Sequence, residues 1–288
     1  MNFAHETLLL ESDEGLPIRA TLTIPDRPCS LVVVIHGFKG FQEWGFFPWI
    51  SEQLASRGHA VCRFDMSRNG VAEDPNTFER LDLFAGDTYS IQLADLRRVM
   101  NELDDRAALG ELPRFLLGHS RGGAIALLGG AIDSRLAGVI TWASISTVDR
   151  WDEATKVEWR KSGSLEVLNQ RTGQTMTLST AVLDDYEANK SRLDVLRAAS
   201  ELEMPLLIVH GSLDDSVPPA EAGAIASNGR DASVVLIQGT GHTFGAIHPL
   251  IHVPRPLQLA MTATAAFISG HSFRPALRRT VDPDHVTK

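Results

Sequence analysis

Short, continuous apolar runs recur along the chain, and stretches with apolar residues three or four positions apart separate most of them. Such runs, rich in β-branched residues, are typical of strands buried on both faces of a sheet, whereas the wider spacing predicts amphipathic helices. The runs cover residues 30–37, 59–65, 114–120, 136–144, 205–211 and 232–238. The helical patterns cover residues 48–58, 88–103, 121–132 and 256–269. This alternation predicts an α/β fold with a mostly parallel central sheet and helices on both faces.

One long segment, residues 145–200, interrupts the alternation because it contains no buried-strand pattern. Trp151 and Trp159 lie in a charged, helix-like stretch. Residues 164–179 alternate around a Thr-Gly pair and predict a hairpin, and residues 183–201 are again helix-like. We interpret the segment as an insertion that forms a cap or lid over the site.

The rest of the chain is expected to form one α/β core domain from residues 1–144 and 201–270. Two strand-like segments at its start, 7–12 and 18–25, flank turn residues and predict an antiparallel pair. Residues 271–288 contain proline and arginine without periodicity, so we expect a loosely held C-terminal tail.

Composition narrows the possible partners and location. The chain has 288 residues and a net charge of −9, and phosphate binding needs clustered lysine and arginine, so a nucleic-acid surface is not expected. The N-terminus is acidic where an export signal is basic, and no apolar run reaches the roughly 18 residues of a membrane helix. Two cysteines, Cys29 and Cys62, do not indicate a disulfide framework. We therefore expect a cytoplasmic protein without membrane contact.

A serine crowded by glycines occupies the junction between the predicted strand at 114–120 and the helix that follows. Gly118, Ser120 and Gly122 fit the pattern G-x-S-x-G, in which a sharp turn holds the serine in a strained backbone conformation. Side chains at the glycine positions would collide in such a turn. A glycine-rich turn that only packs helix against strand is the alternative interpretation. The strand before and the helix after favour a nucleophile at Ser120.

A serine nucleophile needs a base, and the base needs an acid to orient it. The pattern H-G-x-x-D-x-x-V-P after the strand at 205–211 predicts the acid at Asp214, with Asp215 as the alternative. His242 lies in a glycine-flanked loop directly after the strand at 232–238 and is the predicted base. The other downstream candidates for the base are His248, His252, His271 and His285.

The amide of Arg121, at a helix N-terminus beside Ser120, is expected to stabilise a developing oxyanion. The second amide is expected from Phe38, which follows Gly37 in the loop after the first parallel strand. An ordinary strand-to-helix loop is the alternative there. Side chains that could meet a substrate carboxylate, but for which we expect a solvated surface position, are those of Arg68, Arg121 and Arg171.

No cofactor is predicted. The sequence contains neither G-x-x-x-x-G-K-[ST] nor G-x-G-x-x-G, and no histidines and carboxylates have metal-ligand spacing. Histidines beside the functional loops are expected to form structural hydrogen bonds; they are His36, His119 and His210.

Together these motifs resemble the α/β-hydrolase superfamily over nearly the whole chain. The matching stretches are H-G-F at 36–38, G-H-S-R-G at 118–122, H-G-S-L-D-D-S-V-P at 210–218 and G-H-T-F at 241–244. Within the superfamily, the chain is similar to a bacterial group of cytoplasmic hydrolases described as dienelactone-hydrolase-like or serine-aminopeptidase-like. The stretches that carry this similarity are HGFKGFQEWGFFP at 36–48, SRNG at 67–70, RLDLFAGDTYS at 80–90 and NQRTGQ at 169–174. Dienelactone hydrolases have a cysteine nucleophile where this chain has Ser120.

The resemblance implies acyl transfer to water by Ser120, Asp214 and His242, with the amides of Phe38 and Arg121 as the oxyanion hole. We expect an esterase-like serine hydrolase that cleaves a small-molecule carboxylic ester through an acyl-enzyme. A thioesterase or small peptidase with the same triad is the alternative. A third possibility is a binding protein that keeps the fold without catalysis.

Overall fold

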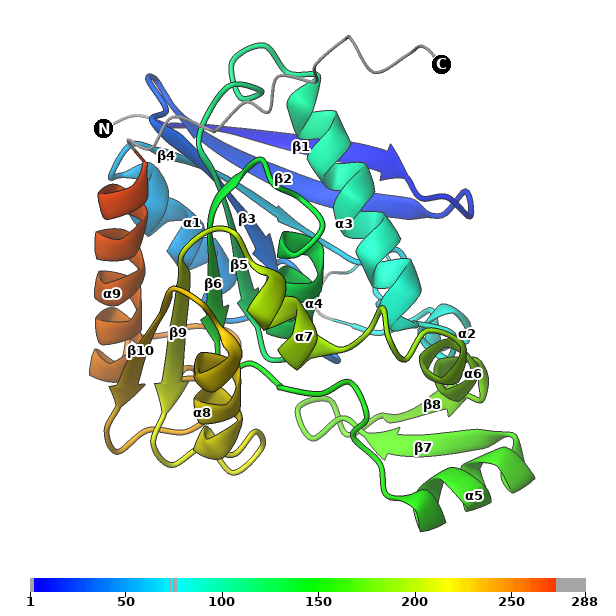
Figure 1. Ribbon diagram of the computed structural model, residues 1–288. Helices are drawn as coiled ribbons and strands as arrows, with labels where there is room; N and C mark the ends of the chain where they lie inside the picture. The colour runs from blue at the N-terminus through cyan, green and yellow to red at the C-terminus, as the bar shows by residue number, and fades with distance from the viewer. Residues whose placement is uncertain (1–2, 73, 75–76, 273–288) are drawn as a thin grey trace, which may run out of the picture.

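The computed structural model describes residues 3–72, 74 and 77–272. Within these residues, eight strands form one sheet in the order β1-β2-β4-β3-β5-β6-β9-β10 (Figure 1). The strands are β1 (Phe3–Glu11), β2 (Pro17–Pro25), β3 (Ser30–Ile35), β4 (His59–Phe64), β5 (Arg114–His119), β6 (Leu136–Trp142), β9 (Leu206–Gly211) and β10 (Ala232–Ile237). β1 pairs with β2 and β2 with β4 in antiparallel fashion, and every other pairing is parallel. The predicted α/β fold with a mostly parallel sheet is confirmed.

Helices cover both faces of the sheet, as the apolar pattern predicts. One face packs against α1 (Phe47–Ala55) and α9 (Arg255–His271), and the other against α3 (Tyr89–Asp104), α4 (Arg121–Gly130), α7 (Val195–Glu201) and α8 (Pro219–Asn228). β3 shows why its sequence is continuously apolar. Leu31 and Val33 enter the core on the α4 face, while Val32 and Val34 enter the core on the α1 face. A strand buried on both faces favours apolar side chains at successive positions, and β3 is apolar from Leu31 to Ile35.

The insertion predicted at 145–200 contains α5 (Glu153–Ser162), a hairpin of β7 (Ser164–Leu168) and β8 (Thr175–Ser179), and α6 (Ala181–Ala188). They lie beside one end of the sheet, at the lower right of Figure 1. Trp159 and Met176 from the insertion pack with Phe41 and Phe78 from the core. This shared apolar cluster fixes the insertion to the loops at the end of the sheet.

Packing divides the insertion differently from its sequence pattern. α7 lies within the predicted cap range, but its buried residues Val195, Ala198 and Ala199 belong to the main core, and the helix contacts α4 and α8.

The short helix α2 (Leu81–Phe84) and the helix α8 have no counterpart among the predicted helices. α8 buries only Ala222 and Ile225, so its apolar periodicity is weak.

The C-terminal helix α9 runs to His271, and most of the predicted tail at 271–288 lies outside the described residues. Among the helices that the structure describes, none combines the length and the apolar character needed to cross a bilayer.

Candidate active site

Ser120 occupies the sharp turn between β5 and α4. Its backbone has φ 57° and ψ −120°, in a region that a residue with a side chain rarely adopts. The Ser120 N–H donates to the carbonyl of Trp142 on the neighbouring strand at 2.9 Å. Strain of this kind persists only where the surroundings over-determine it, and it is typical of functional sites.

The two glycines of the G-x-S-x-G motif are required by close backbone contacts. A Cβ atom at Gly118 would overlap the carbonyl of Gly122. A Cβ atom at Gly122 would overlap the carbonyl oxygens of Ile35 and His36, at the end of β3. The turn therefore brings the start of α4 against the end of β3, so close that only a hydrogen atom fits at the Cα position between the two backbone segments.

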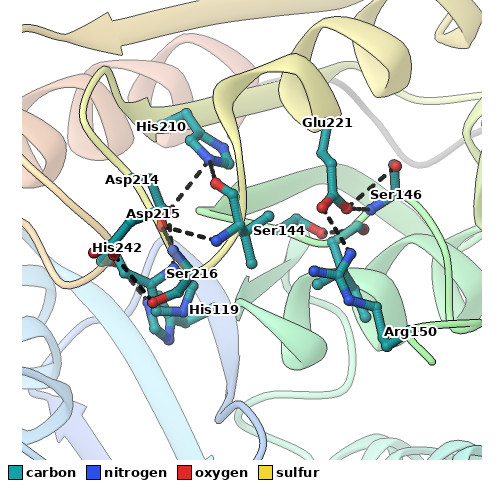
Figure 2. A network of polar contacts seen from close by, with 12 residues as sticks. His119, Ser144, Ser146, Arg150, His210, Asp214, Asp215, Ser216, Glu221 and His242 are labelled. Carbon is teal, nitrogen blue, oxygen red and sulfur yellow. Dashed lines mark hydrogen bonds and ion pairs between the residues drawn. The ribbon is translucent and has the colours of Figure 1, made fainter. Parts of the chain in front are cut away.

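Asp214 and His242 come together above the sheet from the loops that follow β9 and β10. The His242 Nδ1–H donates to Asp214 Oδ2 at 2.8 Å (Figure 2). Asp214 is only 4% exposed, and its Oδ1 accepts from the amides of Ser216 at 3.0 Å and Val217 at 2.9 Å. Asp215, the alternative acid, is exposed. The sequence pattern and the geometry therefore agree on Asp214 as the partner of His242.

The carboxyl group of Asp214 is held in its ionised form. Burial alone would raise its pKa, but hydrogen bonds from His210, His242 and the Val217 amide outweigh burial and bring the pKa below its ordinary value. His210 Nε2 lies 2.9 Å from the Val217 carbonyl and 3.3 Å from Asp214 Oδ2. Two acceptors face this nitrogen, so Nε2 carries the proton. His210 thus has the structural role expected from the sequence, and it also supports the acid.

His119, directly before Ser120, positions the loop of His242. Its Nε2–H donates to the His242 carbonyl at 3.0 Å, and the two ring centroids are 4.7 Å apart. Burial, together with the nearby His242, lowers the pKa of His119 to about 3, so the ring is neutral at physiological pH. The sequence indicated a structural histidine here but gave no sign of its partner.

The other histidines considered as the base lie elsewhere. His248 Nδ1 accepts from the Gly45 amide at 2.9 Å, and His271 contacts the Phe267 carbonyl at 2.8 Å in α9. His252 is exposed, and His285 lies outside the described residues.

The loop after β3 lies directly against the nucleophile turn. A Cβ atom at Gly37 would lie 3.0 Å from Ser120 Cβ and 3.0 Å from the His119 carbonyl oxygen. Phe38 follows Gly37, and Arg121 is the first residue of α4. The two residues predicted to supply oxyanion donors therefore flank Ser120: Phe38 from the loop after β3 and Arg121 from the start of α4.

The side chain of Arg121 corrects the expectation of a solvated position. Arg121 is only 5% exposed, and its guanidinium lies 4.1 Å from the ring centroid of Phe38 and 4.7 Å from that of Tyr89. Its Nη1 is 3.8 Å from Asp87 Oδ2. Two aromatic faces and a buried carboxyl group compensate a charge that the protein removes from water. None of these partners is close to Arg121 in sequence.

The other two arginines have partners as well. Arg68 pairs with Glu14 at 2.6 Å. The guanidinium of Arg171 lies 5.2 Å from the ring centroid of Phe41 and 5.8 Å from that of Phe78.

Two pockets within the described residues open at Ser120, and we name them by their walls. The hairpin pocket has a volume of about 330 Å³ and is lined by Gly37, Phe38, Lys39, Gly40, Trp44, Phe47, His119, Ser120, Asn169, Gln170, Arg171, His242 and Thr243. The arginine pocket has a volume of about 260 Å³ and is lined by Phe38, Lys39, Tyr89, Ser120, Arg121, Ile145, Arg150, Trp151, Val167, Ser216, Val217 and His242. The predicted nucleophile and base thus line both pockets, and the insertion contributes to both walls.

A second polar cluster anchors the start of the insertion to α8. Glu221 Oε2 accepts from the Ser146 amide at 2.7 Å and from its hydroxyl at 3.2 Å, while Oε1 pairs with Arg150 at 2.6 Å (Figure 2). The cluster fixes Arg150 in the wall of the arginine pocket. No sequence signal predicts this cluster, because Glu221 and Ser146 belong to segments without a shared motif.

Comparison with known proteins agrees with this architecture. A family model described as "Alpha/beta hydrolase family" matches residues 32–260. The chain belongs to the alpha/beta hydrolase family.

Among curated relatives, this alpha/beta hydrolase is 29% identical over 212 residues to 2,6-dihydropseudooxynicotine hydrolase of Paenarthrobacter nicotinovorans, covering 71% of this chain and 50% of the relative. It is 31% identical over 105 residues to phospholipase YtpA of Bacillus subtilis (strain 168), covering 35% of this chain and 34% of the relative. The chain thus spans half or less of the length of these relatives.

Solved structures share the fold at low identity. Est1E of Butyrivibrio proteoclasticus, solved with ferulic acid, superposes with a TM-score of 0.69 at 21% identity and covers 92% of this chain and 98% of its own. The esterase domain of a Rhodothermus marinus protein gives a TM-score of 0.64 at 18% identity and covers 93% of this chain and 99% of its own.

No group of three or more histidine, cysteine or acidic side chains in the described part of this chain could hold a metal ion.

Proposed function

We propose that this alpha/beta hydrolase cleaves a small carboxylic ester through an acyl-enzyme on Ser120. The observation that carries the proposal is the hydrogen bond of 2.8 Å from His242 to Asp214, combined with the strained Ser120 that lines the same two pockets as His242. A nucleophile and a base that line the same cavity, with a buried acid bonded to the base, support acyl transfer.

In the proposed mechanism, His242 Nε2 takes the proton of Ser120 as its oxygen attacks the ester carbonyl. Asp214 keeps the proton of the neutral imidazole on Nδ1 and stabilises the imidazolium that forms. The amides of Phe38 and Arg121 receive the oxyanion, and each such donor contributes about 3 kcal/mol to lowering the barrier. His242 then protonates the leaving alcohol. Water, activated by the same histidine, releases the acid and restores Ser120.

The test compares wild type, Ser120→Ala and Ser227→Ala on 4-nitrophenyl butanoate. Ser227 is an exposed serine on α8 that bonds only to the Gly223 carbonyl at 2.8 Å within the described residues, so it is a matched control. We expect Ser120→Ala to lose at least about 10³-fold in kcat, and Ser227→Ala to keep wild-type activity. Wild-type activity in Ser120→Ala would refute the mechanism.

Bond preference is tested on the same preparation with matched butanoyl ester, thioester and arylamide substrates. The proposal predicts the highest kcat/KM on the ester; a higher value on the thioester or arylamide would assign the triad to that reaction instead. A fluorophosphonate probe should label Ser120 in the folded protein. Absence of both labelling and turnover would indicate a binding protein.

A further inference from the structure

The walls of the two pockets at Ser120 carry positive charge although the chain as a whole carries −9. Among the described residues, cationic side chains line the hairpin pocket at Lys39 and Arg171, and the arginine pocket at Lys39, Arg121 and Arg150. Neither lining includes an aspartate or a glutamate. Cations concentrated in a cleft raise the local concentration of anions, and the effect here opposes the net charge of the protein.

The arginines have fixed partners in the protein. Arg121 lies 3.8 Å from Asp87, and Arg150 pairs with Glu221 at 2.6 Å. Arg171 lies over the rings of Phe41 and Phe78. Asp87 and Glu221 therefore offset the charges of Arg121 and Arg150, and none of the three arginines is our candidate for the contact that sets specificity.

Lys39 differs from the arginines in its position and its partners. It lines both pockets, and its ammonium donates to the Leu168 carbonyl in the hairpin at 3.0 Å and lies 5.4 Å from the ring centroid of Phe38. Within the described residues it forms no ion pair with a carboxylate. An ammonium group has three N–H donors, so this one keeps further donors for a ligand.

The surroundings of Lys39 favour an anion beside it. Its partial burial, and secondarily the charge of Arg121, lower the pKa of the ammonium group. A ligand carboxylate next to Lys39 would stabilise the charged form of its ammonium group, which pairs with no carboxylate among the described residues. The backbone of Lys39 has φ 56°, and the Gly40 amide donates to the Gly37 carbonyl at 3.0 Å. This tight turn fixes Lys39 directly beside Phe38, the predicted oxyanion donor.

We propose that the substrate of this site is an ester that carries a carboxylate, and that Lys39 binds this carboxylate while Ser120 attacks the ester carbonyl. The proposal rests on the proposed esterase function and names its substrate class. Because Lys39 lines both pockets, the carboxylate belongs to either the acid or the alcohol part of the ester, and the experiment distinguishes the two.

Two substrate pairs place the same charge on opposite sides of the ester bond. On the acid side, mono-4-nitrophenyl adipate is compared with 4-nitrophenyl methyl adipate, which has the same chain without the charge. On the alcohol side, 4-carboxyphenyl butanoate is compared with its methyl ester. The kcat/KM of each substrate is measured for wild type and for variants at Lys39, so intrinsic differences in reactivity between substrates cancel.

Lys39→Gln removes the charge but keeps an N–H donor for the Leu168 carbonyl, and Lys39→Arg keeps both. Lys161→Gln is the matched control, because Lys161 is an exposed lysine of α5 that lines neither pocket. In at least one pair, we expect Lys39→Gln to lower kcat/KM by about tenfold on the carboxylate ester and by less than about twofold on the methyl ester. Lys39→Arg and Lys161→Gln should keep the wild-type preference, and added salt should reduce it.

Equal losses on charged and neutral esters would show that Lys39 only holds the hairpin, and no loss on either would show that it is unimportant; both results overturn the proposal. Failure of the esterase function is recognised separately, as absent turnover of all four esters. In that case, calorimetric titration with monomethyl adipate decides the inference. Saturable binding to wild type that Lys39→Gln abolishes supports it, and equal or absent binding refutes it.

Discussion

Replacing Asp214 with asparagine should disable His242, the proposed base, without changing the shape of the site. The two oxygens of Asp214 have different partners: Oδ1 accepts from the amides of Ser216 and Val217, and Oδ2 accepts from His242 and faces His210 Nε2 at 3.3 Å. The two backbone donors force the amide oxygen of the asparagine into the Oδ1 position. Its NH₂ group must then face His242 Nδ1. The imidazole can only accept there, so its proton moves to Nε2, the nitrogen that deprotonates Ser120 in the proposed mechanism.

The magnitude follows from the two losses combined. Removing a hydrogen bond to a charged group costs about 1.5–3 kcal/mol, which corresponds to a rate loss of about 10- to 150-fold. Inverting the tautomer as well brings the expected loss of kcat to about 10⁴-fold, or about 5 kcal/mol in the barrier. The change of tautomer therefore accounts for about 2–3.5 kcal/mol of the barrier, which is comparable to the lost hydrogen bond.

Steady-state hydrolysis of 4-nitrophenyl butanoate by wild type, Asp214→Asn and Asp215→Asn measures this directly. Asp215 is the adjacent, exposed carboxylate, so it carries the same chemical change without facing His242. Circular dichroism and thermal unfolding of each variant verify that the protein is folded at the assay temperature. A loss of no more than about 150-fold in Asp214→Asn, which the lost hydrogen bond alone would explain, would refute the tautomer argument, and so would equal losses in both variants.

Two further predictions concern the scaffold. Gly122→Ala forces a Cβ atom against the Ile35 and His36 carbonyls, so it should lower the free energy of unfolding by about 1–3 kcal/mol and abolish activity. The control Gly223→Ala places its Cβ atom in open space on α8 and should be neutral or stabilising. Equal unfolding midpoints for the two variants would contradict the steric explanation. Burial raises the pKa of Asp95, whose Oδ2 accepts from the Ser67 amide at 2.8 Å, to about 7. Because this lies above the unfolded value of about 3.9, the folded state binds more protons in between and loses stability as pH rises from about 4 to about 7. Asp95→Asn should therefore raise the melting temperature by about 4 °C at pH 8 and much less at pH 4.5, and a difference independent of pH would exclude ionisation as its cause.

Much of the fold could be predicted because its signals are local. The continuous apolar runs identified every parallel strand, and the Thr172–Gly173 turn located the hairpin of β7 and β8. α8 was not predicted, because small residues fill most of it and only Ala222 and Ile225 are buried. α7 was assigned to the insertion because sequence proximity says nothing of which helices it packs against.

The sequence by itself determined the candidate residues that spacing can encode: a serine between two obligatory glycines, followed by an acid and a histidine that each come after a parallel strand. Strand ends meet at one edge of a parallel sheet, so chain order is enough to predict their meeting. Only the tertiary structure decided that Arg121 is buried between Phe38 and Tyr89, that His119 holds the loop of His242, and that Lys39 joins two pockets. These contacts join residues from distant segments, and their energies depend on burial and on which charges face each other. Burial and charge pairing exist only once the chain has folded.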